Sequence, residues 1–266
     1  MTPRLVATDL DGTLLRTDGT VSELTRGVLA ELDERDVPVV LVTARPLRWM
    51  DELWPMVGRH GFAIVSNGAI WYDVASGTVR ELRGIEVEAG LRHCAAIAEA
   101  VPDAGFAVEC LSGIKLDPRF VDHHEAPPDS PRGPLAEVWT EPAVKVLVQH
   151  EGLDPADFRE RVIAAVGEAA TPTWTGDHLV EISAAGITKA ATLARLSDEL
   201  GVAAEDVIAF GDMPNDIAML EWAGTSYAVG DADPSVIEAA DHVAPSNDDD
   251  GVARVLSDTF GLAGWL

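Results

Sequence analysis

Residues 5–15 read LVATDLDGTLL, and this stretch decides the fold that the rest of the chain has to fit. Apolar, mostly branched residues lead up to two aspartates, Asp9 and Asp11, which are separated by a single leucine. A short run of this kind is typical of a buried strand, in which alternate side chains point the same way. The two carboxylates therefore share one side at the end of the strand, where like charges repel unless a cation compensates them.

The first part of the chain alternates apolar runs with helical patterns. Residues 37–42 and 62–66 read as further buried strands, and 20–35 has the apolar spacing of a helix. A second helix is expected over 46–57, with Pro46 in its first turn. Near-continuous apolar strands joined by helices predict a parallel sheet that is covered on both faces.

The same alternation returns late in the chain, with a strand over 206–212 and a helix over 214–223. The middle differs, because its helices and strands follow no regular alternation. We therefore predict an α/β fold in which 1–83 and 185–266 form a Rossmann-like parallel-sheet core. An inserted α+β cap domain is expected over 84–184.

Composition and charge restrict the class of protein. Of the 266 residues, 47% are apolar, but no apolar run reaches the roughly 20 residues of a membrane span, and the start lacks a signal-peptide layout. The chain has 45 acids against 19 bases, a formal charge of −26, which repels nucleic acid and anionic lipid. We expect a cytoplasmic protein without a nucleic-acid or membrane partner. The size of the insert favours a monomer.

Carboxylates gather where ligands of open parallel sheets bind, beyond the carboxyl ends of the strands. Asp9 and Asp11 follow the first strand, and Asp212 follows the strand over 206–210. Hard oxygen ligands suit Mg²⁺, so we predict that these three residues hold that ion. A carboxylate can also attack phosphorus to give an aspartyl-phosphate, and a second carboxyl two residues on can protonate the leaving oxygen and then activate water.

Three further side chains suit a phosphate group. Thr43 ends the second strand, Lys189 lies in GITKAATLARL, and Asn215 follows Asp212 by one short turn. Their hydroxyl, ammonium and amide groups are expected to hold the non-bridging phosphate oxygens. Since phosphoryl transfer depends mostly on positioning and electrostatic stabilisation, this set predicts that chemistry.

Taken together, DLDGTLL, the strand-terminal Thr43, Lys189 and GDMPND resemble the haloacid dehalogenase superfamily of phosphatases. The long insert between Thr43 and Lys189 resembles the Cof-type subfamily, class IIB. Further local matches are SNGA at 66–69, HLVEIS at 178–183 and DGVA at 250–253. The resemblance covers essentially the whole chain, in order.

This resemblance implies a role for each carboxylate. Asp9 is expected to be the nucleophile, and Asp11 the general acid/base whose backbone carbonyl binds the metal. Asp212 is expected to be a metal ligand, and Asp216 to orient Lys189 or the water shell of the metal. Lys189 is expected to neutralise the phosphate and to steady Asp9.

The resemblance also implies that Thr43 and Asn215 bind phosphate. The motif TAR stands at 43–45, where relatives often show SGR. Thr43 keeps the hydroxyl, whereas Ala44 is expected to hold the backbone slightly farther from the ligand. For Arg45, a place near the phosphate or the domain hinge and a purely structural role both stay open.

These residues predict a Mg²⁺-dependent phosphatase of a small phosphorylated metabolite, with sugar phosphates as the first guess. Cap residues within 105–125 or 172–183 are expected to select the substrate. A phosphomutase of the same superfamily is the alternative enzyme, although no dedicated signal for it stands in the sequence. A catalytically idle binding or regulatory protein is the third hypothesis, and the full set of acid, base and lysine counts against it.

Overall fold

A computed structural model gives the structure of the chain and describes residues 2–51, 53–56, 61–123, 126–174, 176–262 and 264. Contacts divide the chain into two compact units. The first, called the core unit, comprises Met1–Glu81 and Thr188–Leu266. The second, called the insert unit, comprises Leu82–Ile187.

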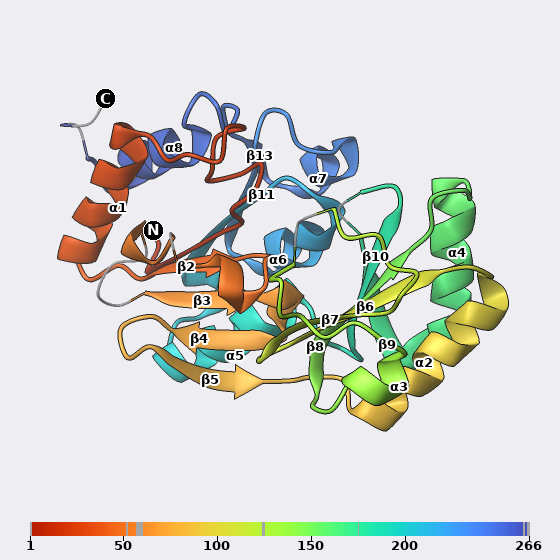
Figure 1. Cartoon of the computed structure of the whole chain (residues 1–266). Coiled ribbons are helices and arrows are strands. Elements are labelled where there is room, and N and C mark those ends of the chain that lie inside the picture. Colours follow the sequence, from red (N-terminus) through yellow and green to blue (C-terminus); the bar gives the residue numbers. More distant parts are fainter. Residues whose placement is uncertain are drawn as a thin grey trace. The chain divides into compact units, whose positions relative to one another are not determined.

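An eight-stranded sheet forms the centre of the core unit, in the order β13-β12-β11-β1-β2-β3-β4-β5 (Figure 1). The strands are β1 Leu5–Thr8, β2 Val39–Val42, β3 Phe62–Val65, β4 Ile70–Asp73, β5 Thr78–Leu82, β11 Val207–Gly211, β12 Thr225–Ala228 and β13 His242–Val243. From β13 to β3 every neighbouring pair is parallel, and β4 runs antiparallel to β3. The predicted α/β fold with a parallel-sheet core is confirmed.

Strand β1 lies at the middle of this sheet because all four of its side chains are buried. Its register places Leu5 opposite Val207 on β11 and Val6 opposite Val39 on β2. The chain thus brings two strands that lie some 200 positions apart in sequence side by side. Their carboxyl ends meet at one edge, which is the edge where parallel sheets bind ligands.

Within the described residues of the core unit, five α-helices accompany these strands: α1 Glu23–Glu34, α5 Lys189–Leu200, α6 Ile217–Trp222, α7 Pro234–Ala239 and α8 Gly251–Phe260. Helix α1 begins after Ser22, whose side chain accepts the Thr25 N–H, as expected for an N-cap. Helix α1 packs against α8, whereas α5 packs against α6, which contacts α7. The crossover from β1 to β2 carries α1, and the crossover from β11 to β12 carries α6. The two crossovers run in opposite directions along the sheet, so right-handed connections put α1 and α6 on opposite faces.

The helix predicted over 46–57 is wrong for the residues that the structure describes. Two short 3₁₀ turns, Leu47–Trp49 and Trp54–Met56, stand there instead. Pro55 gives the physical reason, because proline lacks the N–H that a continuing helix needs and disfavours helical geometry at the residue before it. Residues 52 and 57 lie outside the described part of the chain.

The insert unit is built on a second sheet, which is antiparallel in each pair of strands and has the order β7-β6-β8-β10-β9. Its strands are β6 Gly105–Cys110, β7 Gly113–Leu116, β8 Ala143–Gln149, β9 Ala170–Thr173 and β10 Leu179–Ala184, and its helices are α2 Val87–Ala100, α3 Leu135–Val138 and α4 Pro155–Val166. Apolar side chains of α2 and α4 pack against apolar side chains on one face of this sheet and form a buried cluster with them. The insert is thus an α+β unit.

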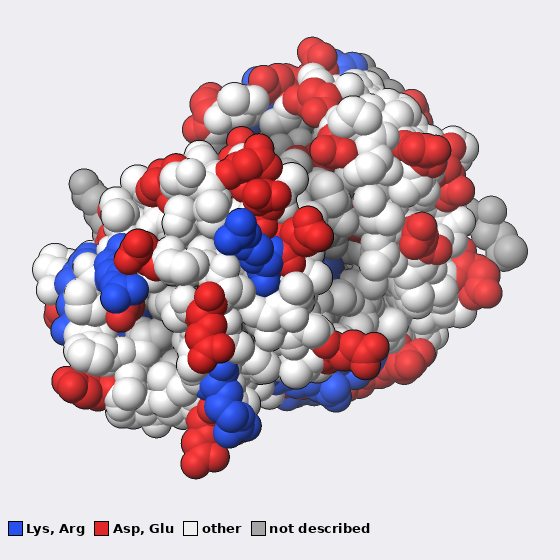
Figure 2. Space-filling model, turned by 90° about the vertical axis from the view of Figure 1, so that its right-hand side faces the viewer, with Lys and Arg blue, Asp and Glu red and all other residues white. Residues whose placement is uncertain are grey.

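Acidic side chains outnumber basic ones in this chain. On the face in Figure 2, Asp and Glu side chains are spread widely, and Lys and Arg form a few small groups. None of the helices within the described residues is both long and apolar enough to span a bilayer.

Candidate active site

The site is built on the carboxyl ends of β1 and β11. Asp9 is the residue after β1, and its backbone N–H donates to the Phe210 carbonyl on β11 at 3.0 Å. Asp212 directly follows β11. The sheet register therefore fixes the backbone of both aspartates, as the sequence predicts.

Lys189 lies between two carboxylates. Its Nζ is 2.9 Å from Asp9 Oδ1 and 2.7 Å from Asp216 Oδ1, and its side chain is 1% exposed. Thr188 starts helix α5 by accepting the Ala191 N–H, so Lys189 stands in the first turn, where a helix disfavours positive charge. The two carboxylates offset that disfavour and the loss of hydration.

Burial alone lowers the pKa of the Lys189 ammonium, but the carboxylates of Asp216 and Asp9 more than reverse this and raise it above its usual value. Lys189 is therefore a cation at neutral pH. A permanent charge at this place can neutralise a bound anion next to Asp9.

Asp216 serves as the anchor of this arrangement. It is fully buried, and its Oδ1 binds Lys189 while its Oδ2 accepts the backbone N–H groups of Asp212 and Met213, both at 3.1 Å. Both carboxylate oxygens are thus engaged with the protein. This geometry agrees with the expected role of Asp216 in orienting Lys189.

Asp212 is held in place by Thr13, which lies in the segment after the neighbouring strand β1. Thr13 Oγ1 donates to Asp212 Oδ1 at 2.7 Å, and Thr13 is 1% exposed. Gly12 lies directly beside it, with a φ of +78°, and a Cβ built there would lie 2.4 Å from Asp212 Oδ2. Only glycine fits both the backbone angle and this contact, which explains the glycine in DLDGT.

Burial raises the pKa of Asp9 well above its usual value; Lys189 lowers it in part, and the neighbouring carboxylates Asp216 and Asp212 raise it further. Burial also raises the pKa of Asp212 to about 6. Oxygen atoms of Asp9, Asp212 and Asp216 lie within 4.8 Å of one another. Crowded, buried carboxylates with hard oxygen donors fit a divalent metal ion, because a bound cation would remove the repulsion that raises these pKa values.

The Asp11 side chain is not part of this buried group. It is 57% exposed and receives two hydrogen bonds from the Arg45 guanidinium, at 2.8 Å from Nε to Oδ2 and 2.5 Å from Nη2 to Oδ1. This bidentate pair raises the pKa of Arg45, chiefly through the hydrogen bond to Asp11. The contact gives Arg45 a place beside the expected acid/base.

The described side chains with metal-binding geometry are those of Asp9, Asp212 and Asp216, so the expected metal contact of Asp11 rests on its backbone carbonyl.

Thr43 and Asn215 lie on neighbouring parts of the same edge. Thr43 follows β2, is 1% exposed, and accepts the Arg45 N–H on its Oγ1 at 3.0 Å, so its own hydroxyl proton is not used in that bond. Asn215 Nδ2 donates to Asn67 Oδ1 at 3.1 Å. Ala44, between Thr43 and Arg45, is half-buried in the turn after β2.

Two residues were not assigned a role from the sequence, Thr13 and Asn67. Thr13 stands in the quoted DLDGT motif, and its link to Asp212 depends on a pairing across two distant strands. Asn67 lies in the SNGA match with a φ of +57°, and its backbone N–H donates to the Thr43 carbonyl at 3.1 Å. Asn67 adopts a left-handed backbone conformation between the buried residues Ser66 and Gly68, and asparagine is one of the residue types that tolerate this conformation.

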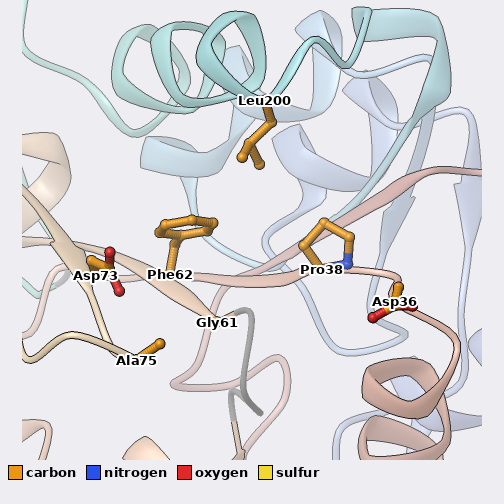
Figure 3. Close-up of a pocket in the computed structure, with 7 residues that line it drawn as sticks. All are labelled: Asp36, Pro38, Gly61, Phe62, Asp73, Ala75 and Leu200. Atoms are coloured by element: carbon orange, nitrogen blue, oxygen red, sulfur yellow. The ribbon is translucent and has the colours of Figure 1, made fainter.

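The core unit also contains a pocket of about 390 Å³ at the opposite end of the strands (Figure 3). Pro38 directly precedes β2 and Phe62 begins β3, so the pocket lies at the amino ends of these strands, with Leu200 of α5 above Phe62. It is therefore separate from the carboxylate site.

Comparison with known proteins identifies the family. The model of the haloacid dehalogenase-like hydrolases matches residues 6–256. The chain belongs to this hydrolase family.

Two relatives show the kind of enzyme in the family. A 5-amino-6-(5-phospho-D-ribitylamino)uracil phosphatase of Bacillus subtilis is 30% identical to this chain, and the match covers 98% of each of the two chains. An HMP-PP phosphatase of Enterobacter sp. is 27% identical over 90% of this chain and 89% of its own. The chain is thus an enzyme of the phosphatase group, as the sequence predicts.

Solved structures show the same fold as this chain. SMU.1108c from Streptococcus mutans superimposes with a TM-score of 0.87 at 24% identity, covering 97% of this chain and 99% of its own. A subclass IIB sugar phosphatase of the family has a TM-score of 0.82 at 20% identity, covering 97% and 99%. These neighbours support the fold that the class IIB resemblance implies.

Proposed function

We propose that this haloacid dehalogenase-like hydrolase is a Mg²⁺-dependent phosphatase that cleaves a small phosphorylated metabolite through an aspartyl-phosphate on Asp9. The observation that carries the proposal is the buried Lys189 ammonium, 2.9 Å from the Asp9 carboxylate. A nucleophilic carboxylate has to meet an anionic phosphoryl group, and the adjacent fixed cation offsets that repulsion. The phosphorylated metabolites named for the two relatives support a substrate of the same kind.

In the proposed reaction, an Asp9 oxygen attacks phosphorus while the bond to the leaving oxygen breaks. Asp11 gives its proton to that oxygen and then takes a proton from the water that hydrolyses the aspartyl-phosphate. Since Arg45 holds both Asp11 oxygens, Asp11 has to leave at least one of these hydrogen bonds to act as the acid. Arg45 thus acts as a positioning residue.

Lys189 and Thr43 are proposed to bind the phosphoryl oxygens together with Asn215. Asp9 and Asp212 are proposed to hold Mg²⁺ with the backbone carbonyl of Asp11. A bound ion would supply positive charge that offsets the negative charge of the phosphoryl group. The sequence-based prediction of a cytoplasmic monomer stays a prediction.

The proposal is tested with p-nitrophenyl phosphate, assayed with Mg²⁺, after chelation, and with Asp9→Asn. We expect metal-dependent release of nitrophenol that the Asp9→Asn variant loses. Asp18→Asn is the matched control, because Asp18 is an exposed turn residue that binds Thr20. Equal rates for the Asp9 variant and the control would refute the role of Asp9.

A further inference from the structure

A buried turn after β3 contacts three parts of the proposed phosphate site. The turn comprises Ser66–Gly68, and all three of its residues are buried and have a positive φ. The Asn67 N–H donates to the Thr43 carbonyl at 3.1 Å, which ties the turn to the end of β2. The turn and the site both belong to the core unit.

The same turn contacts the start of helix α5. Thr192 Oγ1 donates to the Gly68 carbonyl at 2.7 Å. A Cβ at Gly68 would collide with the Thr188 carbonyl oxygen, so glycine alone allows this approach at its φ of +104°. Thr188 caps α5 and directly precedes Lys189. The turn is thus held between the end of β2 and the helix that carries the Lys189 ammonium.

The Asn67 side chain determines the orientation of the Asn215 amide. Asn215 Nδ2 donates to Asn67 Oδ1 at 3.1 Å. The Asn215 Oδ1 is buried and has no hydrogen-bond partner among the described residues. Rotating this amide by half a turn would place its oxygen against Asn67 Oδ1, and two acceptors form no hydrogen bond. Because Nδ2 carries two N–H groups and this bond uses one, the other can donate to a ligand.

We propose that Asn67 is a positioning residue, which orients Asn215 Nδ2 to donate to a phosphoryl oxygen of the substrate. This inference rests on the proposed phosphatase function. A hydrogen bond to a charged oxygen is roughly twice as strong as one between neutral groups. If the amide rotated, its oxygen would face the phosphoryl anion and repel it, so the orientation that Asn67 imposes favours phosphate binding.

Asn67→Gly separates the side chain from the backbone. Glycine adopts a φ of +57° freely and keeps the N–H that binds the Thr43 carbonyl, so only the amide is lost. With p-nitrophenyl phosphate and Mg²⁺, kcat/KM is expected to fall about tenfold, the effect of one hydrogen bond. The inhibition constant of inorganic phosphate should rise by a similar factor, because the same oxygens are bound.

A double-variant cycle distinguishes positioning from a purely structural role. Asn215→Ala removes the amide, and in that background Asn67→Gly should change kcat/KM by less than about twofold, because no amide is left to orient. Two residues that act independently would instead multiply their factors. Asp103→Gly is the matched control, since Asp103 has a φ of +67° but is exposed and lies in the insert unit. Its kcat and KM should equal those of the wild type.

The outcomes separate the two proposals. If Asn67→Gly keeps the wild-type kcat/KM, or has its full effect in the Asn215→Ala background as well, the inference is overturned while the phosphatase proposal stands. If the wild type releases no nitrophenol with Mg²⁺, the phosphatase proposal itself fails. Should Asn67→Gly not fold, Asn67→Ser decides by the same measurements. Its side chain ends one atom earlier than Oδ1, and Ser66, with a φ of +52°, shows that serine adopts this backbone conformation in the turn.

Discussion

Asp216→Asn is the substitution that tests the architecture of the site most sharply. Asp216 is fully buried and is one of two carboxylates that contact Lys189. Breaking a buried ion pair costs about 3–5 kcal/mol, and since Asp9 remains as a partner we take about 3 kcal/mol. The new amide group has one oxygen and one NH₂, so its NH₂ faces either Lys189 or the backbone N–H groups of Asp212 and Met213. This adds about 1–2 kcal/mol.

The variant should therefore lose about 4–5 kcal/mol of unfolding free energy, measured by urea denaturation of the metal-free protein at neutral pH. Asp233→Asn is the control, because Asp233 is only half-buried and caps α7 by accepting the Ser235 N–H, and asparagine caps equally well. A loss below about 1 kcal/mol for Asp216→Asn, as for an exposed pair, would refute the view that this carboxylate anchors Lys189.

Three further predictions concern neighbouring residues. Gly12→Ala should weaken Mg²⁺ binding at least about tenfold, as measured by calorimetry, because its Cβ meets Asp212 Oδ2 at 2.4 Å and displaces that ligand. Gly19→Ala, with the same φ of +78° but nothing within 4 Å, is the control, and equal affinities would contradict the steric argument. In the metal-free protein, Asp212→Asn should raise the unfolding free energy by about 2–3 kcal/mol above pH 6. The folded wild type takes up a proton on Asp212 below a pKa of about 6, before the unfolded chain does, so this gain should shrink as the pH falls from about 6 toward 4. A gain independent of pH would exclude that cause. Thr43→Val should raise KM for p-nitrophenyl phosphate and destabilise the core by about 1 kcal/mol, since the Arg45 N–H loses its acceptor, while Thr43→Ser keeps both values.

The sequence predicts the sheet and the edge that carries the site, because these depend on local patterns. The apolar run before Asp9 and the run before Asp212 each mark a buried strand, and parallel strands have to end at one edge. The structure accordingly brings Asp9, Lys189 and Asp212 together. Their roles in catalysis remain predictions.

Other features depend on side-chain geometry that no local pattern encodes. The bidentate contact of Arg45 with Asp11 joins residues 34 positions apart, and the bond from Thr13 to Asp212 spans 199 positions. The predicted helix over 46–57 is wrong for a local reason: Pro46 suits the start of a helix, but Pro55 breaks one. The pairing of Glu109 on β6 with Lys145 on β8 likewise depends on strand register, which the sequence pattern does not specify.

The central claim is that Asp9 forms a covalent bond to phosphorus, and one measurement tests it directly. The enzyme is mixed with p-nitrophenyl phosphate and Mg²⁺, quenched with acid during turnover, digested and examined by mass spectrometry. The account predicts one added phosphoryl group on Asp9 in the peptide that contains LVATDLDGTLL, and its absence in Asp9→Asn. A phosphoryl group on another residue, or turnover without any labelled Asp9, would contradict it.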